Sequence, residues 1–214
     1  MEMDLSCVMI GPRSYREQLT PSYLADAQLR DVLKSMNTES PIGFRNYTFI
    51  ILLIQYGLRV SELAKLTLDD INWKEETLLI KDRKGQPHLM LPLIKDVTDI
   101  LNKYLSSYRP ASVHPELFLS LKAPVKPLKK NYLSNLARRS FHDVGIKGYA
   151  HLIRHTFAKR LIEQGEPLPV IQKLLGHKDI SSTRIYARLN IEQLREVAQN
   201  DSMEMVKKHE EISE

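Results

Sequence analysis

Four short stretches of the chain contain side chains that could carry out a reaction at a phosphate diester. They read Tyr56-Gly-Leu-Arg-Val-Ser-Glu-Leu63, Lys84-Gly85, His151-Leu-Ile-Arg-His-Thr-Phe157 and Leu174-Leu-Gly-His177, and Tyr186 follows nine residues after the last of them. Together they supply two arginines, one lysine, two or three histidines and a tyrosine, without the cluster of carboxylates that is typical of a metal site. This combination fits a phosphate diester better than a carbonyl group or a sugar, so it predicts phosphoryl transfer without a metal.

Two arginines and a lysine have the chemistry to stabilise such a reaction. Planar guanidinium groups hold charge on the non-bridging phosphate oxygens through paired hydrogen bonds, which is the role predicted for Arg59 and Arg154. Lys84 is our candidate for donating a proton to the leaving sugar oxygen, and Lys81 is the alternative. From the sequence alone, Arg154→Ala is expected to abolish cleavage and to leave the fold intact.

A tyrosine and two histidines complete the candidate set. A tyrosine hydroxyl has an ordinary pKa of about 10, so Tyr186 needs a base to lose its proton near neutrality. His151 could accept that proton, and His177 could hold the phosphate. His151 and Arg154 are three residues apart, so a helix would present both on one face. Tyr186 is expected on a separate short element that could move relative to the others.

The same residues also allow less specific interpretations. A lone arginine after an apolar helix is often a surface residue, and a tyrosine in an amphipathic helix is usually part of the core. His151 and His155 have the spacing of two zinc ligands, with His177 as a third. However, no glutamate follows the first histidine, and Arg154 would place a cation beside the metal. We therefore predict no metal and no other cofactor.

Acidic and basic residues near these motifs have predicted roles other than catalysis. Glu62 and Asp70 could suggest a mechanism with two carboxylates, but we interpret both as helix caps or as partners of nearby basic residues. Among the remaining basic residues, Lys178 and Arg184 flank the segment that leads to Tyr186. These two are predicted to contact DNA phosphates.

The overall composition limits the class of protein. The 214 residues include 31 Lys and Arg against 26 Asp and Glu, and the net charge of +5 favours a polyanionic partner. Cys7 is the only cysteine, so no intrachain disulfide can form and a reducing compartment fits. The strongest apolar run, residues 49–54, is far shorter than the roughly 20 residues that cross a bilayer. We expect a cytoplasmic protein without a membrane partner.

Hydrophobic periodicity, together with Pro and Gly signals, predicts a mainly α fold with a small antiparallel β-hairpin (α+β). Residues 77–80 and 89–93 flank a charged segment that contains Gly85, which is typical of a hairpin. Gly57 is expected to end or bend a buried helix. The predicted helices are 20–36, 44–56, 61–66, 95–106, 129–144, 150–164, 167–175, 180–187 and 191–199. Residues 1–19 and 200–214 are expected to be tails.

These motifs resemble the tyrosine recombinase (phage integrase) family. The family pattern has an arginine in a G-x-R-x-S-E-L box, a lysine in a β-hairpin, an H-x-x-R-H box, and L-G-H nine residues before the nucleophile. This sequence has all four in order. The resemblance covers residues 20–190, which are expected to form the catalytic domain. It implies catalytic roles for six residues: Arg59, Lys84, His151, Arg154, His177 and the nucleophile Tyr186.

The resemblance also implies a reaction and a set of partners. Tyr186 would form a 3′-phosphotyrosyl link and release a 5′-hydroxyl, and a 5′-hydroxyl of another strand would reverse the linkage during integration, excision or inversion. A homotetramer is expected to act on two paired sites in double-stranded DNA, with an accessory DNA-bending protein. Residues 191–214, a helix and charged tail, are expected to contact a neighbouring protomer. Because most family members carry a further N-terminal helical domain, we expect either a minimal recombinase or a piece of a longer protein, with weak DNA affinity on its own.

Two other functions stay open at this point. One is a DNA-binding regulator that keeps the recombinase scaffold but does not cut, and the other is an enzyme like the type IB topoisomerases. The presence of all six catalytic residue types argues against the regulator. The short chain and the spacing from L-G-H to Tyr186 favour a recombinase over a topoisomerase.

Overall fold

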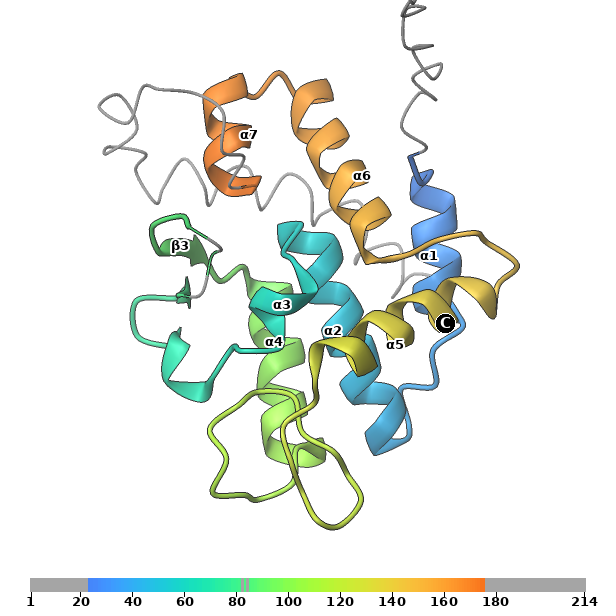
Figure 1. The fold of residues 1–214 in the computed structure, drawn as a ribbon, viewed down its shortest axis with the longest axis vertical. Coiled ribbons are helices and arrows are strands. Elements are labelled where there is room, and N and C mark those ends of the chain that lie inside the picture. Colours follow the sequence, from blue (N-terminus) through green and yellow to red (C-terminus); the bar gives the residue numbers. More distant parts are fainter. Residues whose placement is uncertain (1–22, 82, 84, 176–214) are drawn as a thin grey trace, which may run out of the picture.

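The fold combines helices with one small sheet, as predicted, in a computed structural model that describes residues 23–81, 83 and 85–175 (Figure 1). The helical elements are α1 (Asp26–Lys34), α2 (Pro41–Tyr56), α3 (Val60–Leu63), the 3-10 turn η1 (Leu68–Asp70), α4 (Lys95–Lys103), the π-helical turn η2 (Tyr104–Tyr108), α5 (Lys130–His142), α6 (Ala150–Glu163) and α7 (Leu168–Leu175). The strands are β1 (Ile71–Asn72), β2 (Thr77–Ile80) and β3 (Leu89–Pro92). The predicted fold class is confirmed.

Helix α2 is the centre of the core. Twelve of its 16 residues are buried, so it is surrounded by other elements instead of presenting one apolar stripe. It contacts α1, α4, η2 and α6. The helix begins earlier than predicted, because Ser40 caps it by accepting a hydrogen bond from the Gly43 N–H at 3.1 Å and Pro41 occupies the first turn.

The sheet has three antiparallel strands in the order β1-β2-β3. In the predicted hairpin, Leu78 pairs with Leu91 and Ile80 pairs with Leu89, and all four side chains are buried. Met90, on the opposite face of β3, is 50% exposed, as expected from the alternation of side chains along a strand. The third strand, β1, was not predicted, because two residues are too few to show a period.

The carboxy-terminal half of the described chain is helical, with boundaries close to those predicted. Helix α6 packs against α2 and α7, and it buries Leu152, Ile153, Phe157 and Leu161. The predicted helix 95–106 is instead α4 followed by the π-helical turn η2. The first helix was predicted to begin at residue 20, but α1 begins only at Asp26, where the extended Ala25 donates its N–H to Gln28 Oε1 at 2.9 Å and caps the helix. Both predicted helices beyond residue 175 and both tails lie outside the described residues. Among the described residues, no helix is both long and apolar enough to span a membrane.

Candidate active site

Arg59 is placed by the sharp junction between α2 and α3. Gly57 ends α2 in the left-handed conformation, with φ at +57°, and its N–H donates to the Leu53 carbonyl at 3.0 Å. Two residues later, the Arg59 N–H donates to Glu62 Oε2 at 2.7 Å, while Arg59 Nη1 donates to Glu62 Oε1 at 2.9 Å. The Arg59 side chain is 24% exposed and the Glu62 side chain only 1%, so the buried carboxylate orients a guanidinium group that still reaches the surface.

Arg154 lies in the first half of α6 and connects this helix to the ends of α2 and α7. Its Nη1 donates to the Gly57 carbonyl at 2.8 Å, and its Nη2 donates to the carbonyl of Leu175, the last residue of α7. Burial and then the positive charge of Arg59 lower the pKa of Arg154 to about 10. The group therefore stays charged at neutral pH, and it lies near enough to Arg59 for the two positive charges to interact.

His151 lies at the start of the same helix, one turn before Arg154. Burial of part of the imidazole, followed by the charge of Arg154, lowers the pKa of His151. At neutral pH the ring is therefore predominantly neutral and can accept a proton. Its ring centroid is 5.9 Å from that of His155, with the two rings perpendicular.

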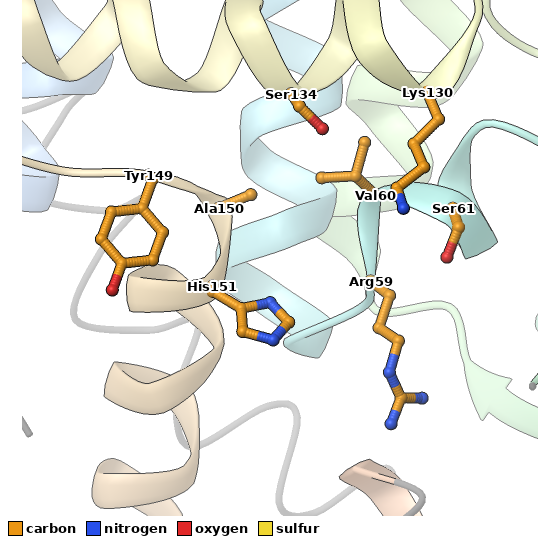
Figure 2. A pocket seen from close by; sticks show the side chains of 8 residues that line it. All are labelled: Arg59, Val60, Ser61, Lys130, Ser134, Tyr149, Ala150 and His151. Atoms are coloured by element: carbon orange, nitrogen blue, oxygen red, sulfur yellow. The ribbon is translucent and has the colours of Figure 1, made fainter.

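Arg59 and His151 line one pocket of about 370 Å³ (Figure 2). Figure 2 shows side chains that enter it from the α2–α3 junction, from α5 and from the start of α6. The lining residues are Arg59, Val60, Ser61, Lys130, Ser134, Tyr149, Ala150 and His151. Among the described residues, three basic side chains and three hydroxyl groups line the pocket and no carboxylate does, a combination that can bind an anion such as a phosphate diester.

Some lining residues were not identified from the sequence. The sequence motifs do not single out Ser61, Lys130, Ser134 or Tyr149 as site residues. Helix α5 packs against both α3 and α6, and this packing brings Lys130 and Ser134 to the pocket. A sequence pattern within one helix does not report such a contact between helices.

The two acidic residues have the structural roles that the sequence analysis expected. Glu62 caps α3 and pairs with Arg59. Asp70 Oδ2 accepts hydrogen bonds from the Thr67 N–H and hydroxyl, both at 2.8 Å, and its Oδ1 lies 2.6 Å from Lys81 Nζ. The hydrogen bond to Asp70 raises the pKa of Lys81.

The described part of the chain therefore brings together three of the six predicted catalytic residues, Arg59, His151 and Arg154. The other three lie outside the described residues: Lys84, His177 and Tyr186. The predicted DNA contacts Lys178 and Arg184 also lie outside them.

Comparison with known proteins identifies the family. The sequence profile of the phage integrase family matches residues 22–193, a range that includes all six candidate catalytic positions. The chain belongs to the phage integrase family. It is 37% identical over 183 residues to the candidate integrase/recombinase y4gC of Sinorhizobium fredii, covering 83% of this chain and 94% of y4gC. It is 32% identical over 185 residues to the tyrosine recombinase XerD of Listeria innocua, covering 84% of this chain and 62% of XerD.

The fold of this phage integrase family member is also that of a solved recombinase. The crystal structure of XerA recombinase matches 87% of the chain with a TM-score of 0.66 and 25% identity, and the match covers 66% of the XerA chain. The expected tyrosine recombinase catalytic domain, in a family of site-specific DNA recombinases, is therefore confirmed. Apart from y4gC, the chain spans only 41–65% of the length of the curated relatives compared.

The lowered pKa of His151 gives a testable pH dependence for this integrase. We expect the imidazole of His151 to titrate below the ordinary value of about 6.5. At pH values between 6.5 and the lower pKa of His151 in the folded protein, the unfolded chain binds the proton more tightly than the folded chain. The free energy of unfolding should therefore decrease as the pH drops through this range. Two-dimensional NMR of ring-labelled histidine measures the titration, with His151→Gln assigning the signal. A midpoint at or above 6.5 would contradict the expected burial effect.

Proposed function

We propose that this chain cuts and rejoins DNA strands at specific sites through a 3′-phosphotyrosyl intermediate on Tyr186. The observation that carries the proposal is the pocket lined by Arg59, Lys130 and His151, with no carboxylate among its described lining residues, near the buried guanidinium group of Arg154. Two fixed guanidinium groups and a neutral imidazole suit the charge and proton requirements of phosphoryl transfer.

In the proposed reaction each group has one role. The Tyr186 hydroxyl passes its proton to neutral His151 as its oxygen attacks phosphorus, and the bond from phosphorus to the 5′ oxygen breaks. Arg59 and Arg154 hold the non-bridging oxygens, and His177 assists them. Lys84 gives a proton to the departing 5′ oxygen. A 5′-hydroxyl from another strand then attacks the phosphotyrosine, so the energy of the phosphodiester bond is retained.

The proposal extends to partners that follow from the chemistry. The substrate is double-stranded DNA, and exchange of both strands between two sites needs four active protomers. We propose a homotetramer on paired DNA sites in the cytoplasm, associated with the nucleoid, with an accessory DNA-bending protein where the site must be deformed. Residues 191–214, outside the described residues, are proposed as the contact between protomers.

A strand-exchange assay tests this function. Two duplexes of different length share one binding site, selected by the protein from a random duplex library, and are incubated with the protein in EDTA. Recombinant duplexes of the two new lengths are expected, and a duplex pair with a scrambled site is the control. Binding without any new product would favour the non-cutting regulator. Relaxation of supercoiled plasmid without a site would favour a topoisomerase-like activity.

A further inference from the structure

We propose that Arg83 is a positioning residue for proton delivery to the leaving oxygen, because it fixes the β2–β3 connection to the end of α7. This inference rests on the proposed function, in which Lys84 donates that proton. Arg83 does not line the described pocket, so its effect would act through the position of its neighbours.

Arg83 is buried, although most of its described neighbours in the β2–β3 connection are exposed. It is only 4% exposed, whereas Lys81, Gly85, Pro87 and His88 are all exposed. Its Nη2 donates to the carbonyls of Lys173 at 3.0 Å and Leu174 at 2.6 Å, both in the last turn of α7. A polar hairpin connection is thus attached at one residue to a helix 90 positions later in the sequence.

The contact has a clear physical basis. The last four carbonyls of a helix have no partner within the helix, and the helix dipole makes that end negative. Arg83 and Arg154 both donate to these carbonyls, one from the hairpin and the other from α6. Burial lowers the pKa of Arg83, but the Glu62 carboxylate, 3.8 Å from its Nε, offsets part of the cost of burying the charge.

Glu62 links this contact to the candidate active site. Its Oε1 lies 2.9 Å from Arg59 Nη1 and 3.8 Å from Arg83 Nε, so one carboxylate serves both guanidinium groups. In the sequence, Lys84 directly follows Arg83. Loss of the Arg83 contacts would therefore shift the backbone next to the proposed proton donor, while Arg59 keeps its bond to Glu62 and Arg154 keeps its bonds to Gly57 and Leu175.

The test uses a substrate whose leaving group departs without receiving a proton. In one nicked duplex the scissile 5′ oxygen is replaced by sulfur, which leaves as a thiolate, and the matched duplex keeps the oxygen. We expect Arg83→Gln to slow cleavage of the oxygen duplex about 100-fold, the typical contribution of a positioned general acid, while changing cleavage of the sulfur duplex less than about threefold. Lys34→Gln, an exposed residue in the last turn of α1, is the control for loss of one charge.

Arg83→Lys keeps the charge and is the second variant, in case Arg83→Gln does not fold. It is expected to slow only the oxygen duplex, about 10-fold, because one ammonium group can replace part of the contact. Equal slowing of both duplexes would overturn the inference in favour of a general role in folding or phosphate binding, and so would unchanged cleavage of both. Wild-type protein that binds the site but cleaves neither duplex would instead overturn the proposed function.

Discussion

Replacing Arg154 by alanine is expected to reduce cleavage by at least about 1000-fold and also to destabilise the fold by about 2–4 kcal/mol. The first effect follows from its proposed role, because a guanidinium group that holds the non-bridging oxygens acts mainly in the transition state. The second follows from its contacts with the carbonyls of Gly57 and Leu175, which would lose a charged donor. The sequence alone predicts an intact fold, but Arg154 is buried, so we expect a loss of stability as well.

Two measurements separate these effects. Urea unfolding gives the loss of stability, and cleavage is then measured at a temperature and protein concentration where the variant is fully folded. Arg154→Lys is the matched control, since it keeps the charge but cannot reproduce the planar pair of donors. A folded Arg154→Ala protein that cleaves at the wild-type rate would remove Arg154 from the mechanism.

Gly57→Ala is the second change with a large expected effect. Gly57 has φ at +57°, where a side chain costs about 1–2 kcal/mol, and an added Cβ would lie 2.3 Å from Cδ1 of Phe157. Phe157 is buried on α6, three residues after Arg154, so it cannot move outward into solvent. Strain and overpacking together should lower the free energy of unfolding by about 2–5 kcal/mol. Cleavage should also fall, because Gly57 precedes Arg59 and binds Arg154.

The chain offers a matched control for Gly57→Ala. Gly145 also has a positive φ, +73°, but an added Cβ there would meet no atom of the described residues within 4 Å. Gly145→Ala should therefore show the backbone strain alone, and the difference between the two variants in urea unfolding measures the contact with Phe157. Equal losses of stability at both positions would contradict the close packing of the α2–α3 junction against α6.

Features that depend on the residues of a single helix or strand could be predicted from the sequence. The apolar run in α2, the alternation in β2 and β3, and the spacing of His151 and Arg154 each lie within a single helix or strand, and the structure has all of these elements. The left-handed end of α2 at Gly57 was also predictable, because glycine favours that conformation.

Contacts between distant segments were not predictable in the same way. Lys130 reaches the pocket only because α5 packs against α3 and α6, and Arg83 is buried only because the end of α7 lies beside the hairpin. The sequence predicts that Arg154 faces a phosphate. It does not predict the two hydrogen bonds of Arg154 to backbone carbonyls at the ends of α2 and α7. In the sequence, Arg83 and Arg154 look like ordinary surface cations, because the carbonyls to which they donate lie between 21 and 97 positions away.

The most direct test is to trap the covalent intermediate. A nicked duplex that carries the selected site, labelled on the strand that keeps the 3′ phosphate, is incubated in EDTA with wild-type protein or with Tyr186→Phe, and the products are separated on a denaturing gel. A labelled protein–DNA band with the wild type and none with Tyr186→Phe is the predicted result. A band of equal strength with Tyr186→Phe, or no band from wild-type protein that demonstrably binds the site, would contradict Tyr186 as the nucleophile.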